Sequence, residues 1–131
     1  AEEVILRGVG ALLIDPSKGF YRLAEHQRRV VGQLMITAEW SDWRCGYWWW
    51  IQSVYVPPDS RRLGVFRALY ESILHEARTR GDICGLRLYV EKDNQSAQAT
   101  YESLGMKPGK YALYEAEIMR QVDVATSCLP K

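Results

Sequence analysis

Three arginines surround one glycine where an apolar segment, ending near Val56, gives way to an amphipathic one. Arg61, Arg62 and Arg67 flank Gly64. A helix that begins directly after such a loop presents bare backbone N–H groups and the positive end of its dipole. Glycine lets the backbone approach a ligand closely, and guanidinium groups can add charge-assisted hydrogen bonds. The pattern predicts a phosphate-binding loop; the alternative is a solvated basic helix start in which Gly64 is a plain turn residue.

A second group of polar residues follows about thirty positions later. Asn94 and Tyr101 are seven residues apart, so they share one face of a helix across two turns. A phenol with a pKa of about 10 stays protonated at neutral pH and can donate its proton. The alternatives are structural: Tyr101 as a core aromatic residue, and Asn94 as a helix N-cap, which is compatible with a binding role.

The five tryptophans fall within a short span: Trp40, Trp43, Trp48, Trp49 and Trp50. On a strand, Trp48 and Trp50 would face one way and Trp49 the other. Aromatic faces can hold a cationic or flat ligand by cation–π or stacking contacts. Filling of the core and a hydrophobic rim, or a subunit contact, is the competing interpretation, and it is the one we favour for most of the five.

The elements that would position these residues follow from periodicity. Residues 2–14 place apolar side chains on one helical face, and Pro16 and Gly19 then end the helix. Three strands are expected next, over 20–25, 30–38 and 47–56, with a hairpin connection at 40–44. The second and third strands are apolar on both faces, which is typical of strands inside a sheet.

The second half of the chain alternates helix and strand. Five apolar residues recur at helical spacing after the loop, and Gly81 marks the end of that helix. A strand over 86–90, a helix from Asn94 to Gly105 and a last strand over 111–118 complete the order. We therefore expect an α/β fold with a mixed, mostly antiparallel sheet flanked by helices.

Size and charge bound the function. A chain of 131 residues suits a single domain, 1–131, and a net charge of +1 provides no global field toward nucleic acid or a membrane. The three cysteines form no CxxC pair, and the two histidines have no partner at metal-ligand spacing, so we expect no metal site. With no secretory signal or membrane span recognised, a cytoplasmic location is expected.

Taken together, the two motifs resemble those of the GNAT superfamily of acyl-CoA-dependent N-acetyltransferases. The match runs from about residue 31 to 117, and the family's phosphate loop corresponds to Arg61-Arg62-Leu63-Gly64-Val65-Phe66. Phe66 replaces the small residue usual at the last position. The strand and first helix that usually open the family's fold are not recognised here, so we expect either a fragment or a differently built acceptor side.

The resemblance implies acetyl-CoA or coenzyme A as the cofactor. Its diphosphate would bind the phosphate loop, and its pantetheine arm would lie along the end of the preceding strand like an added strand. Tyr101 would act as general acid toward the thiolate, and a backbone N–H of Tyr55 or Val56 would bind the oxyanion. The cofactor-binding residues expected on this basis are Val54, Tyr55, Val56, Arg61, Arg62, Leu63, Gly64, Val65, Phe66, Arg67, Asn94, Ala97 and Tyr101.

The general base is not evident from the sequence. Some relatives have a glutamate on the central strand, eleven residues before the first residue of the loop, where this chain has Trp50. Glu39, or a water held by Gln52, Ser53 or Tyr55, could take its place, although a solvated strand-end charge also explains Glu39. We expect Glu39, Trp48 and Trp50 to border the acceptor.

The resulting hypothesis is an N-acetyltransferase that acts on a primary amine of a small molecule or a protein. The alternative is a non-catalytic acyl-CoA-binding or sensing module, which the tryptophan at position 50 and Phe66 favour somewhat. In a purely structural domain, both motifs would be coincidence. Relatives are often dimers, so a homodimer is compatible with the sequence.

Overall fold

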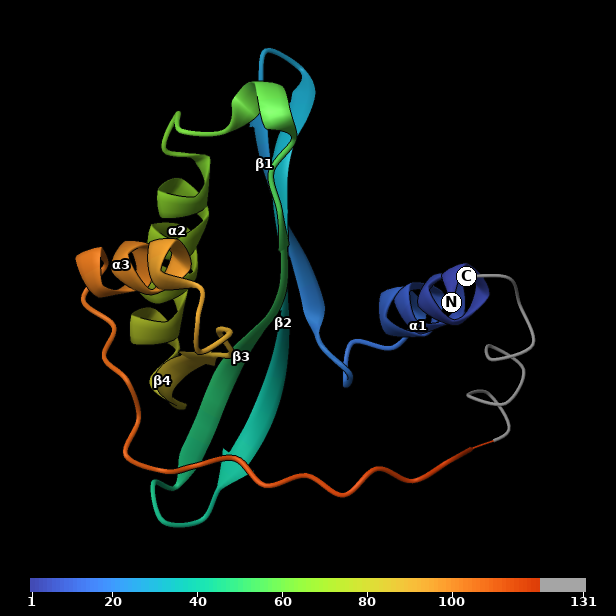
Figure 1. The fold of residues 1–131 in the computed structure, drawn as a ribbon, viewed down its shortest axis with the longest axis vertical. Helices are drawn as coiled ribbons and strands as arrows, with labels where there is room; N and C mark the ends of the chain where they lie inside the picture. Colours follow the sequence, from blue (N-terminus) through green and yellow to red (C-terminus); the bar gives the residue numbers. More distant parts are fainter. Residues whose placement is uncertain (121–131) are drawn as a thin grey trace.

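The computed structural model describes residues 1–120, which form three α-helices, a short 3-10 helix and one four-stranded sheet (Figure 1). The elements in chain order are α1 Glu2–Ile14, β1 Phe20–His26, β2 Arg29–Ser41, β3 Gly46–Tyr55, η1 Pro58–Ser60, α2 Val65–Arg80, β4 Ile83–Leu88 and α3 Gln95–Ser103. The mixed α/β class and the mostly antiparallel sheet are as expected from the sequence.

The strands lie in the order β1-β2-β3-β4, with antiparallel pairing except between β3 and β4, which are parallel. The parallel step requires a crossover, and α2 makes it. Figure 1 shows α2 and α3 on one side of the sheet and α1 on the other. We call the face of the sheet turned away from α2 the far face.

The core lies between α2 and the sheet. The apolar stripe expected on α2 is the one that packs: Leu69, Tyr70, Ile73 and Ala77 are buried, and Phe66 lies partly buried against them. They meet Leu34, Ile36, Trp49 and Ile51 of the two inner strands. Gly32 lets α2 approach β2 closely, because a Cβ at this position would lie 2.6 Å from the Val65 Cγ1. The sheet thereby fixes the start of α2.

Strands β3 and β4 separate part-way along β3. Their last paired residues are Ile51 and Leu88, so the end of β3 has no partner on that side among residues 1–120. One position further along, Gln52 is an extra residue between the pairs Met35–Ser53 and Ile36–Ile51. Such a bulge bends a strand and increases its twist. The parting of β3 and β4 leaves the backbone groups of residues 52–55 unpaired on the β4 side.

Two expectations about the last strands were wrong. The strand expected over 86–90 lies at Ile83–Leu88, and the segment 111–118 is in no strand. Alternating polarity was the basis for that last strand, but a strand also needs a partner edge, and 111–118 pairs with no strand in the described part of the chain. Its large apolar side chains are accordingly exposed, including Tyr111, Leu113 and Tyr114.

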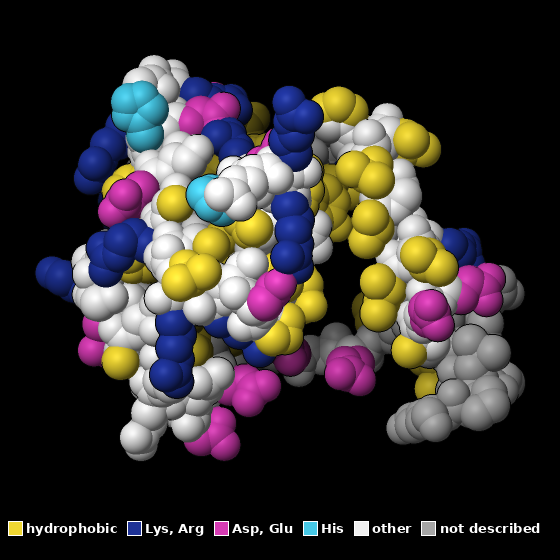
Figure 2. All heavy atoms as spheres, turned by 90° about the horizontal axis from the view of Figure 1, so that it is seen from above, with side chains coloured by type: hydrophobic (Ala, Val, Ile, Leu, Met, Phe, Trp, Pro, Cys, Tyr) yellow, Lys and Arg dark blue, Asp and Glu magenta, His cyan; other side chains and the backbone are white. Residues whose placement is uncertain are grey.

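Helix α1 occupies the expected residues but buries less than its pattern suggests. Leu12 is its one buried residue, whereas Ile5, Leu6, Leu13 and Ile14 are exposed. Figure 2 shows apolar side chains gathered on the part of the molecule that α1 forms, separated by a hollow from the rest. Within residues 1–120, no helix has the length and apolar character needed to cross a membrane.

Candidate active site

The loop between η1 and α2 presents unpaired backbone amides. The first helical hydrogen bond of α2 runs from the Ala68 N–H to the Gly64 carbonyl, 3.0 Å, and within residues 1–120 the amides of 63–67 donate to no backbone carbonyl. Gly64 caps the helix with φ of 79°. This left-handed conformation is easy for glycine. The amides and the positive end of the helix dipole therefore converge on one small region, which suits an anion.

The three arginines of this loop have different surroundings. The Arg61 Nε donates to the Val56 carbonyl, 2.9 Å, and Arg67 lies 3.8 Å from Glu71 across one helical turn. Arg62 has no ion pair among the described residues and adopts φ of 63°. Among the described residues, Arg62 is thus the one arginine of this loop for which neither an ion pair nor a side-chain hydrogen bond is observed.

Phe66 does not fill the loop. Its ring lies 5.8 Å from that of Tyr101 in an edge-on arrangement and 6.3 Å from that of Tyr70. The side chain thus points between α2 and α3, into the partly buried margin of the core. The large Phe66 side chain is therefore accommodated by packing against the core, although the family usually has a small residue here. The side of Gly64 where the amides lie stays open.

Asn94 and Tyr101 lie at the start and near the end of α3. The Asn94 Oδ1 accepts from the Ala97 N–H, 3.1 Å, so Asn94 is an N-cap as expected. Burial raises the pKa of Tyr101 above its usual value of 10, and the phenol is therefore protonated at neutral pH. A protonated phenol is the form required of a general acid.

Loop 59–65 separates two cavities. The smaller, about 290 Å³, lies between the loop and α3; it is lined by Val56, Ser60, Arg61, Arg62, Gly64, Val65, Phe66, Arg67, Thr100, Ser103 and Leu104. Six of these were expected to bind the cofactor in addition to Val56: Arg61, Arg62, Gly64, Val65, Phe66 and Arg67. The ring of Tyr101 packs edge-on against that of Phe66, which lines the cavity. Val56, the residue after β3, the loop and the second half of α3 therefore meet at one cavity. Of the other residues expected to bind the cofactor, Val54, Tyr55, Leu63, Asn94, Ala97 and Tyr101 do not line it.

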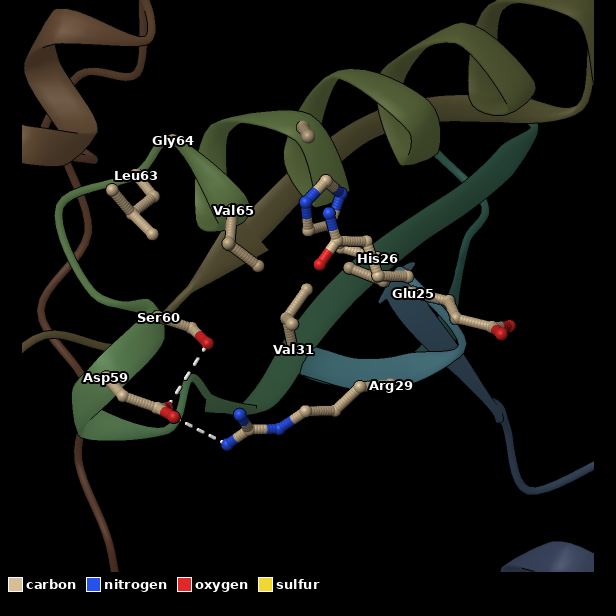
Figure 3. A pocket seen from close by; sticks show the side chains of 12 residues that line it. Glu25, His26, Arg29, Val31, Asp59, Ser60, Leu63, Gly64 and Val65 are labelled. Carbon is tan, nitrogen blue, oxygen red and sulfur yellow. Dashed lines mark hydrogen bonds and ion pairs between the residues drawn. The ribbon is translucent and has the colours of Figure 1, made fainter.

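The larger cavity, about 480 Å³, lies on the other side of the loop, against the turn between β1 and β2. Figure 3 shows Arg29 reaching Asp59, while Glu25 points away from the cavity. The Arg29–Asp59 distance is 2.6 Å, and this hydrogen bond holds the pKa of Asp59 below its usual range. The sequence did not predict this cavity, because it joins two segments that are thirty residues apart.

The far face carries the residues expected to border the acceptor. Trp48, Trp50 and Glu39 share this face, and they are joined by Arg87 of β4, which no sequence motif had marked. The Arg87 Nη1 lies 2.9 Å from the Glu39 Oε2, and its Cζ lies 3.7 Å from the centre of the Trp48 ring. Glu39 is therefore an ion-pair partner, a poor state for a general base. Trp49, on the opposite face, is buried in the core.

Comparison with known proteins identifies the fold. The model of the acetyltransferase (GNAT) family matches residues 3–106 of this chain. The chain belongs to the GNAT acetyltransferase family. The reaction class of a GNAT protein is acetyl transfer, and the family generally uses acetyl-CoA.

Solved structures agree with this assignment. A possible acetyltransferase from Clostridium difficile 630 is 47% identical, with a TM-score of 0.86 over 92% of this chain and 79% of that one. A probable acetyltransferase (22% identity, TM-score 0.77, 92% and 81% coverage) shares the fold. So does a ribosomal-protein-alanine N-acetyltransferase from Brucella melitensis biovar Abortus 2308, at 18% identity and a TM-score of 0.72, over 86% and 80% of the two chains. No curated protein matches the chain in a sequence comparison.

Proposed function

We propose that this GNAT protein is an N-acetyltransferase that moves the acetyl group of acetyl-CoA to a primary amine of a small molecule or a protein. The observation that supports it most is the cavity between the amide-lined loop and α3, which reaches Val56, the residue after the unpaired end of β3. Acetyl-CoA would supply an activated thioester and a diphosphate. The family match supports the reaction class, and the amine as acceptor is our inference.

Each group has a role in this proposal. The amides of residues 63–67 bind the diphosphate, with Arg62 adding charge. The free edge of β3 at Val54 and Tyr55 bonds the pantetheine arm, whereas the Val56 carbonyl is already used by Arg61. Asn94 and Ala97 border the arm at the start of α3.

The chemistry needs an oxyanion donor and an acid. The amine nitrogen forms a bond to the thioester carbon while a backbone N–H of Tyr55 or Val56 stabilises the charge on the carbonyl oxygen. The C–S bond then breaks, and the Tyr101 hydroxyl protonates the departing sulfur. The nitrogen loses one proton to water, and Tyr101 recovers its proton from solvent.

Thiol release from acetyl-CoA with a panel of amines tests the proposal. Tyr101→Phe should lower kcat by about 10²-fold or more, while the dissociation constant for coenzyme A measured by calorimetry stays within about twofold. Tyr111→Phe, an exposed tyrosine outside the site, is the matched control and should leave both unchanged. Unchanged turnover in Tyr101→Phe would reject the acid assignment.

A second function, binding or sensing of acyl-CoA without catalysis, is favoured by one observation. The carboxylate nearest to a base position, Glu39, is bound to Arg87, and position 50 carries an indole. The same assay separates the two functions. Heat on titration with coenzyme A, together with no thiol release for any amine, would support the sensing module.

A further inference from the structure

A stacked aromatic pair lies where β3 and β4 part. The rings of Trp50 and Tyr89 are 4.5 Å apart at 24°. Tyr89 directly follows Leu88, the last residue of β4 that pairs with β3, and 57% of it is exposed. From the sequence, Tyr89 was expected only as part of a strand. The pair thus offers an accessible flat surface at the parting.

The direction from which a second reactant arrives follows from the layers. The cavity that would take the cofactor lies between the loop and α3, and α2 covers that side of the sheet (Figure 1). If the thioester reaches the parting from this side, as the proposed function requires, the acceptor must come from the far face. On that face, Trp50 and Tyr89 border the parting.

The one carboxylate that β2, β3 and β4 place on the far face is already paired. This carboxylate is that of Glu39, which strand alternation and the observed contacts place on the far face. It forms an ion pair with Arg87. The neighbouring amide of Gln52 donates to the Thr37 hydroxyl, 3.0 Å. These strands therefore provide no free carboxylate to attract an alkylammonium group or to remove its proton.

We propose that the acceptor is an aromatic primary amine whose amino group is bonded directly to a planar ring. An alkylamine, with a pKa of about 10, is almost fully protonated at pH 7 and needs a base. An arylamine is neutral at this pH, because its lone pair is delocalised into the ring. The ring stacks on Tyr89 beside Trp50, and the neutral nitrogen points into the parting.

The reaction balances without a carboxylate base. The aryl nitrogen bonds to the acetyl carbon, the C–S bond breaks, and Tyr101 protonates the sulfur. The nitrogen, strongly acidified by addition, releases its proton to water. This inference rests on the proposed function and narrows its acceptor class.

Three amines of similar size distinguish an arylamine acceptor from an alkylamine acceptor: 4-methylaniline, benzylamine and cyclohexylamine. At pH 7, we expect kcat/KM for 4-methylaniline to exceed that for cyclohexylamine by about 10²-fold or more, with benzylamine between them. Rates with the two alkylamines should rise about tenfold per pH unit toward pH 9, and the rate with 4-methylaniline should stay nearly flat. An alkylamine used as well as the arylamine at pH 7 would overturn the proposal.

Variants at position 89 test the stacking surface. Tyr89→Ala should raise KM for 4-methylaniline about tenfold with little change in kcat or coenzyme A affinity, and Tyr89→Phe should restore KM. Tyr114→Ala, at an exposed tyrosine outside the site, is the control. An unchanged KM in Tyr89→Ala would show that the acceptor ring does not stack on Tyr89. Acetylation of alkylamines only rejects this inference and leaves the proposed function standing, whereas coenzyme A binding without acetylation of any amine rejects both.

Discussion

Arg62 holds a backbone conformation that is unfavourable for a residue with a side chain. Its φ of 63° lies in the left-handed region, which costs about 1–2 kcal/mol for L-residues. Arg28, in the turn between β1 and β2, has nearly the same φ, 62°. In a tight hairpin turn such as that of Arg28, a left-handed conformation matches the twist of the two strands. Arg62 is not in a hairpin, and it lies beside the amides proposed to bind the diphosphate, where backbone strain often accompanies function.

These two arginines provide a matched pair. Arg62→Gly and Arg28→Gly should each raise the free energy of unfolding by up to about 1 kcal/mol, because glycine adopts this conformation freely. Only Arg62→Gly should weaken coenzyme A binding, by about tenfold, through loss of a charge-assisted hydrogen bond. Urea unfolding and calorimetry measure the two effects. If both variants bound coenzyme A with the same affinity, Arg62 would not be part of the diphosphate site.

Gly32 is a position where one methyl group should disturb the start of α2. A Cβ there would lie 2.6 Å from the Val65 Cγ1 and 3.3 Å from the Leu69 Cδ1. We expect Gly32→Ala to lower the free energy of unfolding by about 1–3 kcal/mol. Gly10→Ala on α1, where no atom lies within 4 Å of the new Cβ, should instead raise the free energy of unfolding by about 0.5–1 kcal/mol. A neutral Gly32→Ala would contradict this close packing.

Among the elements, the β1–β2 turn and the loop before α2 are linked by the Arg29–Asp59 ion pair. Because the hydrogen bond from Arg29 lowers the pKa of Asp59, the stabilisation is complete above the unfolded pKa of about 4 and is lost as pH falls through the lower folded value. Both side chains are exposed, so the effect is small.

The pH dependence is measured by comparing Asp59→Asn with the wild type. The variant should have a slightly lower Tm at pH 7, and the difference should vanish near pH 2. Arg29→Gln removes the other partner of the same ion pair and should show the same pattern. A difference that grows at low pH would mean that the ion pair does not lower the pKa of Asp59.

At the scale of the whole molecule, stability should reside in the layer between α2 and the sheet. Ile73 is fully buried there, and Ile73→Ala should lower the free energy of unfolding by about 2–5 kcal/mol. Leu113 lies in the segment that joins no strand and is 58% exposed. Leu113→Ala should therefore change stability by about 0.5 kcal/mol or less. A large loss in Leu113→Ala would mean that this segment packs.

Local patterns predicted most of the elements. The stripe on α2, the cap at Asn94 and the helix end at Gly81 all depend on residues within a few turns of one another, and all three are present. The segment 111–118 was misjudged, since alternation does not say whether an edge is available. Its exposed leucine and tyrosines show that polarity alone does not make a strand.

The sequence by itself determined the family, the glycine loop before α2 and the capping of α3 by Asn94, because these depend on residue type and short spacing. The tertiary structure decided what lies beside them. The Glu39–Arg87 pair joins residues 48 positions apart, Phe66 turns toward Tyr101, and β3 and β4 part after Ile51. Such contacts form only when distant segments pack, so no short-range pattern encodes them.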